Sequence, residues 1–550
     1  MSAADATFAE VLPLGHGRGR GATRAAERGA RPALVLPLLG GVVLVAAGVF
    51  LTTGKLALAA APALVLAAVA AVWTMPLRHT VYVYLAVLLA AFAPPVAHAD
   101  GGVWTVARPL AEVLFGGLHR LTGIGALVLT GGELLAVLLL AVALVRTLRG
   151  SRLDAAGRLP IANVVLVACL VSCAAVVLLI VWGAARGGAV RASLFQFRNL
   201  LLIGPLTVLL SHAFRDLRDF ARAAVLATVG IAVKIALGIH FLVADAWPKA
   251  LKIEDMTGHH DTVPYVVLLF VWCATWVHAP SLRRLLVVLP PVAWLMTGIV
   301  LNDRRVAYVT LAASFGLLYL LMRGPLKRRL TRALILALPF LAVYLLLART
   351  HSEGIFKPAA QLMSVGDQSD ASNVWRETEN ANLIFTLGHH PVVGSGWGHE
   401  YAELFVLPSI ASIYPQYRLA PHNSVLWLLG VGGMVGFALI WMPLVVGVYL
   451  ATRSYHHART PAERTAAAGV LATLLAYVLQ AWGDMGTQGM IPALCAAYAL
   501  ALSGKLARQT GAWPAHVSLL ATRHGRSAAL AAPARADALG AGSPPPRLPP

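Results

Sequence analysis

The side chains best suited to acid–base and anion chemistry are concentrated in residues 349–436, a polar stretch in a chain that is otherwise almost continuously apolar. The stretch contains Arg376 and ends near Pro421-His422-Asn423, where a long apolar segment begins. A polar connection of this length is uncommon unless it has a function, because ordering it costs conformational entropy. We therefore expect the reactive groups to lie here and at the helix start that follows.

His422 is the candidate general base. A neutral imidazole accepts a proton near neutral pH, and Asn423 directly behind it either orients the ring or caps the helix. A histidine at a helix start can also be a simple cap or an interface residue. The position of His422, after Pro421 and at the point where the polar stretch closes, favours the base.

Arginines provide the candidate anion-binding groups. The run Asn302-Asp303-Arg304-Arg305 is a short turn between two apolar segments, so the Arg305 side chain begins at a helix end. A guanidinium offers a planar fork of donors that matches a phosphate. The alternative for any one arginine is that its long stem reaches toward lipid headgroups. Further candidates expected at the same membrane face are Arg186, Arg191, Arg198, Arg349, Arg376 and Arg418.

The elements that must position these residues are membrane helices. The chain has 550 residues, of which 58% are hydrophobic and 12% are charged, and a soluble domain cannot bury that much apolar surface. The apolar runs are continuous rather than alternating, which excludes a barrel of strands. We predict an all-α, polytopic integral membrane protein with about 12–14 transmembrane helices. The predicted apolar segments are residues 33–53, 56–75, 79–97, 124–147, 160–184, 197–213, 219–244, 262–279, 283–301, 305–323, 331–348, 422–451, 466–484 and 486–503.

These segments divide the chain into five parts. Residues 1–32 and 504–550 are expected to be disordered tails, the second because of its low complexity. Residues 33–348 form an N-terminal transmembrane bundle, residues 349–421 a large loop, and residues 422–503 the C-terminal transmembrane helices.

The distribution of positive charge predicts the orientation. The formal net charge is +20, and the clustered arginines fall in the tails and in alternate connections between apolar segments. By the positive-inside rule, both termini are cytoplasmic and the 349–421 loop is extracytoplasmic, in a multi-pass protein of the plasma (inner) membrane. The basic charge then faces anionic membrane lipids, so no nucleic-acid partner is expected.

Four further features have less chemical content. The run Gly394-Ser395-Gly396-Trp397-Gly398 lacks the Lys-Ser/Thr pair of a phosphate-binding loop, and we expect a tight turn that holds Trp397 against a sugar or the loop core. The small residues at 432–436 favour close helix packing. His259-His260 suggests a metal site only weakly, because further ligands are not nearby in the sequence. The cysteines lie inside apolar segments and indicate core positions.

Three pieces of the chain together resemble the O-antigen ligase and polymerase family of bacterial membrane glycosyltransferases. The first is the short arginine-bearing turn at residues 302–308. The second runs from Trp375-Arg376-Glu377 to the His-Pro and spaced glycines of residues 390–398. The third is the His-Asn helix start at residues 421–436. The resemblance covers residues 290–450, and the chain departs from it in having about two extra helices and a doubled Arg304-Arg305.

The resemblance implies transfer of glycan from a polyprenyl-diphosphate-linked donor to an acceptor hydroxyl on a glycan, lipid or protein, without metal or cofactor. In that chemistry His422 is the base. Arg305, with Arg198 as a possible second, stabilises the diphosphate leaving group. Arg304, Arg376, Arg418 and Asn423 are further substrate-binding candidates, and the resemblance separates neither Arg304 from Arg305 nor ligase from polymerase.

Two other classes of function compete with this interpretation. A transporter of anions or small solutes is expected to show discontinuous helices or charge pairs inside the membrane, and Lys234 and Glu133 are candidates for such charges. A non-enzymatic scaffold does not need arginines clustered at one face. The loop constellation outweighs two scattered charges, so glycosyl transfer is the favoured hypothesis.

Overall fold

The computed structural model describes residues 69–92, 108–118, 129–149 and 159–514, except for residues 71, 252, 254, 352–355, 365–370 and 412–415. In these residues the regular secondary structure is helical throughout, without a strand. Ten of the described helices are long and apolar enough to cross a membrane, and two shorter apolar helices accompany them. The predicted fold class is therefore confirmed. The predicted segment 33–53, most of 56–75, all of the tail 1–32 and most of the tail 504–550 lie outside the described residues. Residues 504–509 of the second predicted tail continue the last helix, because their small and apolar side chains are buried in the bundle.

The described helices follow the predicted apolar segments, and several extend beyond them. The helices that start at Val190, Pro325 and Pro461 begin several residues early, and those that end at His457 and Gln509 end about six residues late. A helix can continue into polar residues whose long side chains reach the interface. The apolar helices are α4 (Leu77–Ala90), α7 (Gly131–Leu148), α8 (Asn163–Ala185), α9 (Val190–Ala213), α10 (Leu217–Phe241), α11 (Thr262–His278), α12 (Leu282–Asn302), α13 (Arg305–Leu321), α14 (Pro325–Thr350), α17 (Ser424–His457), α18 (Pro461–Gly483) and α19 (Met490–Gln509). Short helical pieces beside them are α5 (Arg108–Phe115), η3 (Leu242–Ala246), η4 (His259–Asp261) and η6 (Gly486–Gln488).

Lys505 joins three connections at one end of the bundle. Its side chain is fully buried, and Nζ donates to the backbone carbonyls of Leu159 at 3.0 Å and Phe214 at 2.5 Å. The Leu159 amide donates to the Arg215 carbonyl at 2.8 Å. The amine thus satisfies carbonyls at the end of α9 that have no helical partner. Arg215 lies in one of these connections, and the assignment of this end to the cytoplasm stays a prediction.

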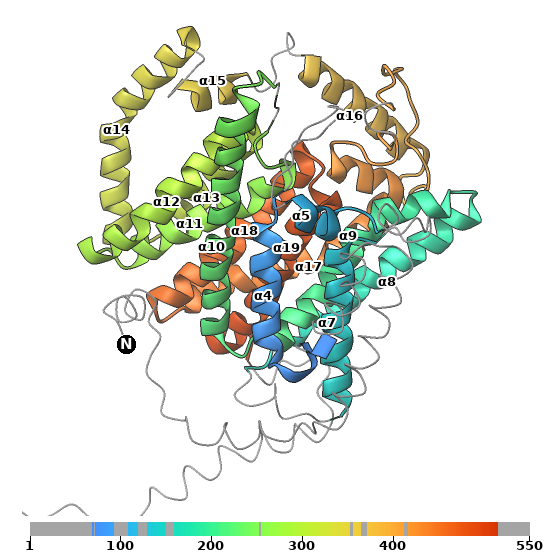
Figure 1. Cartoon of the computed structure of the whole chain (residues 1–550), viewed down its shortest axis with the longest axis horizontal. Coiled ribbons are helices and arrows are strands. Elements are labelled where there is room, and N and C mark those ends of the chain that lie inside the picture. Colours follow the sequence, from blue (N-terminus) through green and yellow to red (C-terminus); the bar gives the residue numbers. More distant parts are fainter. Residues whose placement is uncertain are drawn as a thin grey trace, which may run out of the picture.

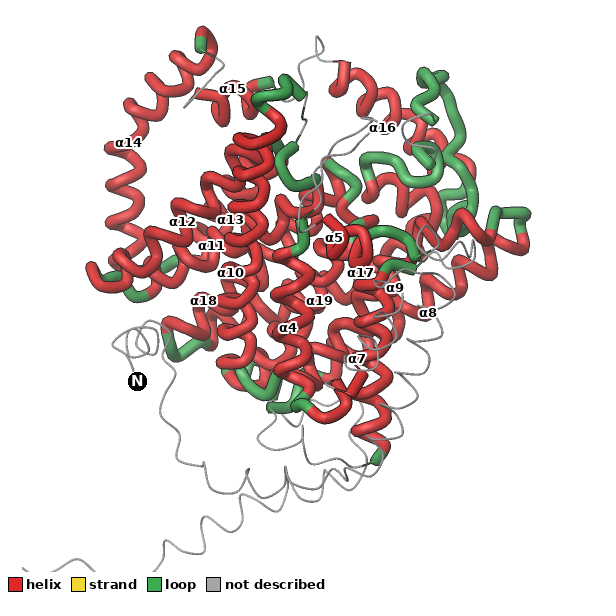
Figure 2. Tube along the Cα trace, viewed as in Figure 1, coloured by secondary structure: helices red, strands yellow, loops and turns green. Residues whose placement is uncertain are grey.

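The 349–421 segment is partly helical and lies at the other end of the bundle. It contains α15 (Lys357–Met363) and α16 (Ala371–His389), which extend beside the ends of the apolar helices in Figure 1. The loop that follows α16 gathers against the same end (Figure 2). Helix α14 leads into this segment and stands apart from the bundle, with Ala348 as its one buried residue.

Helix α17 is broken at Gly433, and the loop after α16 fills the break. Gly433 has φ 58° and ψ −170°, a conformation open to glycine alone. The carbonyls of Gly430 and Val431, released from the helix, accept from the amides of Ser395 and Gly396 at 3.1 and 2.9 Å. On the other side of the break, residues 434 and 435 donate to the carbonyls of residues 391 and 392 at 2.9 and 3.0 Å. The glycine run predicted to serve packing therefore also creates a docking site for the loop.

Trp397 lies in the protein core. It is 1% exposed, its indole N–H donates to the Val176 carbonyl at 3.0 Å, and its ring packs against Phe197 and Trp427. Of the two predicted roles for Trp397, the structure supports the loop core and contradicts contact with a sugar, because a fully covered ring offers no face to a ligand.

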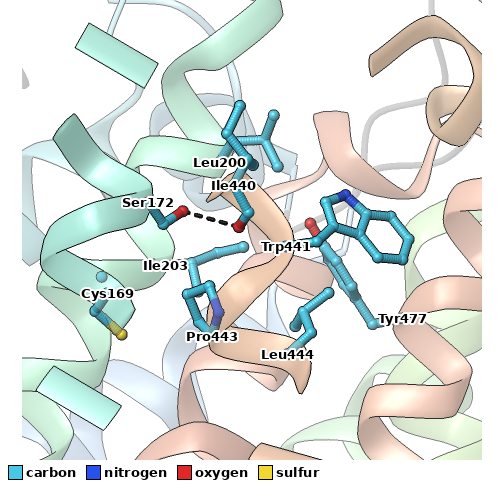
Figure 3. A pocket seen from close by; sticks show the side chains of 10 residues that line it. Cys169, Ser172, Leu200, Ile203, Ile440, Trp441, Pro443, Leu444 and Tyr477 are labelled. Carbon is cyan, nitrogen blue, oxygen red and sulfur yellow. Dashed lines mark hydrogen bonds between the residues drawn. The ribbon is translucent and has the colours of Figure 1, made fainter. Parts of the chain in front are cut away.

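A small cavity of about 10 Å³ lies deeper in the bundle, between α8, α9, α17 and α18 (Figure 3). Ser172 on its wall donates to the Ile440 carbonyl at 2.9 Å, in the turn before Pro443. Proline removes one amide donor from α17, and polar side chains commonly support a membrane helix near such a position. The space matches about one water molecule, so the cavity belongs to the packing of these helices.

Candidate active site

Helix α16 carries the polar residues of the candidate site. Asn373, Arg376 and Asn380 follow one another at spacings of three and four residues, so they project from the same side of the helix. Glu379 lies on the adjoining side, which also buries Leu383. Helix α17 packs against α16. Helix α16 is therefore placed to hold side chains against His422.

Glu379 holds the His422 ring. The carboxylate is 1% exposed, whereas the His422 side chain is 23% exposed. Oε2 of Glu379 lies 3.2 Å from Nδ1 of His422 and accepts the His422 backbone N–H at 2.9 Å. Because a carboxylate only accepts hydrogen bonds, this contact places the proton of a neutral ring on Nδ1 and leaves the lone pair on Nε2. This tautomer is the one that a general base acting through Nε2 requires.

Asn423 caps the helix behind His422. Its Oδ1 accepts from the Leu426 amide at 3.1 Å, and its Nδ2 donates to Asn380 Oδ1 at 3.0 Å. Of the two predicted roles for Asn423, the contacts are those of a helix cap rather than those of a residue that orients the ring. The bond to Asn380 adds a second link between α16 and the start of α17.

The end of α18 joins His422 to the turn between α12 and α13. The Met485 amide donates to the His422 carbonyl at 2.9 Å. Asp484, beside it, accepts from His259 Nδ1 at 2.8 Å. The other ring nitrogen of His259 lies 2.7 Å from a guanidinium nitrogen of Arg304. The base candidate and the arginine turn, more than a hundred residues apart in sequence, thus meet across one buried helix end.

Asp484 is a buried anion held by its neighbours. Burial alone would raise its pKa, but the hydrogen bond and charge interactions from His259, Arg304 and Arg376 outweigh burial and hold the pKa well below its usual value. The Asp255 carboxylate, 5% exposed, also forms an ion pair with Arg304. Two buried carboxylates therefore fix this arginine in the network.

Arg304 and Arg305 differ in their surroundings. Arg304 is 15% exposed and is committed to Asp255 and His259. Arg305, the first residue of α13, donates from Nη1 to Asn373 Oδ1 on α16 at 3.4 Å. Arg304 is thus held by a buried carboxylate and a histidine, whereas the part of Arg305 in contacting a phosphate stays a prediction.

The remaining arginine candidates are spread over the same end of the bundle. Among the described residues, Arg376 has no carboxylate within ion-pair distance, although its charge acts on Asp484. Arg418 is paired with Glu403 at 2.6 Å, on the loop side of the site. Arg198 is paired with Glu133 at 3.3 Å, at the N-terminal part of α9. The structure thus brings Arg376 next to the His422 region and places Arg198 and Arg418 in separate ion pairs.

The His259-His260 turn serves hydrogen bonding in this structure. Both ring nitrogens of His259 have protein partners, Asp484 on one side and Arg304 on the other. No group of three or more side chains suited to hold a metal occurs in the described residues.

Glu379, Asp484 and Asp255 are site residues to which the sequence analysis assigned no role. Glu379 precedes His422 by 43 residues, and a contact over that distance leaves no local pattern. One available signal was the periodicity of α16, since Glu379, Asn382, Leu383 and Thr386 share its buried side. A carboxylate on the buried side of an otherwise polar helix indicates a specific partner.

Residues 290–441 match the sequence model of the O-antigen ligase family. The matched segment includes the arginine turn, α16, the glycine loop and His422, whereas Arg198 and Asp484 lie outside it. No curated protein matches the chain. The resemblance drawn from the sequence is confirmed over this segment, and the match supports an O-antigen ligase-like membrane glycosyltransferase whose partners are a lipid-linked glycan and an acceptor.

Proposed function

We propose that this protein transfers or polymerises glycan from a polyprenyl-diphosphate-linked donor onto an acceptor hydroxyl at the extracytoplasmic face of the membrane. The observation that carries the proposal is the contact between the buried Glu379 carboxylate and Nδ1 of His422. Both residues lie within the segment that matches the O-antigen ligase family. Ligase and polymerase share this chemistry and differ in the acceptor, which is a lipid or protein in one case and a glycan in the other.

In the proposed reaction, Nε2 of His422 removes the proton of the acceptor hydroxyl as its oxygen attacks the anomeric carbon of the donor sugar. The bond between that carbon and the diphosphate oxygen breaks, and the electron pair leaves with the diphosphate. Glu379 holds the ring and stabilises the imidazolium that forms. The proton then passes from His422 to the released diphosphate or to water.

Arg305 and Arg376 are the groups we assign to the leaving diphosphate. Arg305 starts α13 and contacts α16 through Asn373, and Arg376 lies one turn along from Asn373 on the same helix. Guanidinium donors fixed before the reaction stabilise developing charge, and one such donor is worth about 3–4 kcal/mol in a transition state. In this mechanism the arginines supply the positive charge, and no metal ion takes part in the transfer step.

Two structural features favour the alternative of a multi-pass transporter. Helix α17 is discontinuous at Gly433, and Lys234 forms an ion pair with Asp261 at 2.8 Å within the bundle. The break in α17 is filled by the chain's own residues 391–396, which leaves its backbone groups bonded rather than open to a solute. Together with the family match, this favours glycosyl transfer.

The decisive experiment gives purified protein a polyprenyl-diphosphate-linked glycan and an acceptor and measures release of polyprenyl diphosphate. We expect His422→Gln to lower turnover by about 10²–10⁴-fold, because the change removes the base from the chemical step and keeps a polar side chain. Donor binding should stay nearly intact, and a chelator should leave wild-type turnover unchanged.

The matched control is His456→Gln, at an exposed position near the other end of α17 from His422. We expect His456→Gln to behave like the wild type. Full turnover of His422→Gln would exclude His422 as the base, and turnover lost on adding chelator would exclude the metal-free mechanism.

A further inference from the structure

A half-open cavity of about 260 Å³ lies beside the candidate active site, lined by residues of α5, α7, α9, α10, η4, η6 and the start of α19. His259, which bonds Asp484 and Arg304 in the site, also lines this cavity. Gln488, three residues after the Met485 amide that holds His422, lines it as well. The cavity and the site therefore share one wall, although the cavity residues Arg198, Lys234 and Asp261 lie outside the segment that matches the O-antigen ligase family.

The charges around the cavity are balanced in two pairs. Arg198 lies 3.3 Å from Glu133, and Lys234 lies 2.8 Å from Asp261. Glu133, Lys234 and Asp261 are all at most 5% exposed in their side chains. A diphosphate placed here would add negative charge to a lining that is already neutral, and burying an uncompensated charge is costly. The lining therefore fits an uncharged ligand.

Unpartnered polar atoms show which kind of uncharged ligand fits. Asn199 is 2% exposed, and its Nδ2 donates to the Gln488 carbonyl, whereas its Oδ1 is buried without a hydrogen-bond partner. Nδ1 of His260 is likewise buried without a partner, and both residues line the cavity. A buried acceptor left unsatisfied is unfavourable. A hydroxyl group, which donates and accepts, satisfies such atoms.

The walls also limit the size and shape of the ligand. The volume is below the range of about 300–1,000 Å³ typical of pockets for drug-sized molecules, so the cavity fits one ring-sized unit. Phe115 lies on one wall, with the Lys234 amine 5.6 Å from its ring centroid. An aromatic wall beside charged and amide groups suits a ring with an apolar face and hydroxyls at its rim.

We propose that this cavity is a binding site for one neutral, hydroxyl-rich sugar unit, held by Asn199 and by the Arg198–Glu133 and Lys234–Asp261 pairs. That this sugar belongs to the acceptor or donor glycan rests on the proposed function. Arg198 then binds sugar together with Glu133 rather than binding the diphosphate. Carboxylates accept from sugar hydroxyls and cations donate to them, and such charge-assisted bonds are the stronger ones.

The test uses ligand-observed NMR on the purified full-length protein, with glucose, galactose, rhamnose and N-acetylglucosamine as separate probes. We expect at least one of these sugars to bind the wild type. Asn199→Leu should lower the affinity for that sugar at least tenfold, because the change removes the unpartnered acceptor. The matched control is Asn163→Leu, the same change at the first residue of α8 near the opposite end of the bundle, which should bind the sugar normally. Inorganic pyrophosphate should not displace it.

A second variant tests the charge balance and keeps the test decisive if Asn199→Leu fails to fold. Glu133→Gln keeps the size of the side chain and removes the carboxylate that lies 3.3 Å from Arg198. We expect this variant to bind the sugar severalfold more weakly and to bind pyrophosphate, which the wild type does not bind. Unchanged sugar binding in either variant would overturn the proposal, as would wild-type protein that binds no probe sugar or binds pyrophosphate in competition with it.

The experiments give different results if the sugar site is wrong and if the proposed function is wrong. Free-sugar binding is measured without any transfer, and the same experiment on His422→Gln should give wild-type binding because the base is outside the cavity. Sugar binding by a wild type that transfers no glycan would reject the proposed function and keep the site. Transfer without sugar binding would reject the site and keep the function.

Discussion

At the scale of single residues, the proposed chemistry depends on how firmly His422 is held. Glu379 accepts both the backbone N–H and the ring of His422, so one buried carboxylate fixes the chain and the imidazole together. The carboxylate contacts no reacting atom in the proposed mechanism, and it is therefore a positioning residue. Its effect should appear in turnover and leave substrate binding unchanged.

The first prediction at this scale concerns Glu379→Gln. The amide keeps the size and one acceptor but loses the charge that stabilises the imidazolium, so we expect kcat to fall by about 10²–10⁴-fold with KM nearly unchanged. Glu379→Asp should recover part of the loss. The control is Glu377→Gln, two residues away on the exposed side of α16. A change in KM alone, or equal effects of both Gln variants, would show that Glu379 does not act through His422.

The second prediction separates Arg305 from Arg304. Arg305→Lys should lose most activity while the protein still inserts and accumulates, because an ammonium cannot reproduce the two parallel bonds of a guanidinium to phosphate. Arg304→Lys should be milder in turnover, and it should lower the thermal midpoint in detergent because Arg304 bridges Asp255 and His259. Full activity of Arg305→Lys would exclude a specific contact of Arg305 with phosphate and would indicate that its side chain only reaches lipid headgroups.

At this scale the sequence suggested His422 and Arg305 as candidates because each stands at an abrupt change from polar to apolar sequence. It did not identify the Glu379 carboxylate, or the link from Asp484 through His259 to Arg304. These contacts join separate helices and depend on how the helices pack, and packing of distant elements is not encoded in local spacing.

At the scale of elements, α16 and the broken helix α17 form one unit. The membrane helices were predictable because each is a long apolar run. The break at Gly433 was not, since a glycine in an apolar helix usually marks close packing. Here the break is stable because residues 391–396 supply four backbone hydrogen bonds to it. The same loop follows α16 directly, so the break helps to fix the helix that carries Glu379.

The third prediction tests this unit with Gly433→Ala. Any side chain at Gly433 is strained by its positive φ and would meet the backbone of Val392. We expect a loss of about 1–3 kcal/mol in stability, faster proteolysis within residues 390–400, and lower transfer activity. Gly388→Ala, within helix α16 and with open space at its Cβ position, should be neutral or slightly stabilising. Equal stability of the two variants would mean that the loop does not depend on the break.

At the scale of the whole molecule, the site and the basic connections occupy opposite ends of the bundle. The glycine loop, α16 and His422 lie together at one end, and Lys505 joins residues 159 and 214–215 at the other. The fold class followed from composition, whereas the orientation deduced from the charge pattern stays a prediction. The free-standing position of α14 could not be predicted, because its sequence is as apolar as that of a packed helix.

The last prediction concerns the orientation of this arrangement. After replacement of the four native cysteines, single cysteines are introduced by Ser409→Cys in the loop before α17 and by His457→Cys at the end of α17, both at exposed positions. An impermeant maleimide should label Ser409→Cys in intact cells or spheroplasts and label His457→Cys only after permeabilisation, because the arginine-rich connections should face the cytoplasm. The reverse pattern would place His422 and Arg305 on the cytoplasmic side, where an extracytoplasmic transfer reaction could not use them.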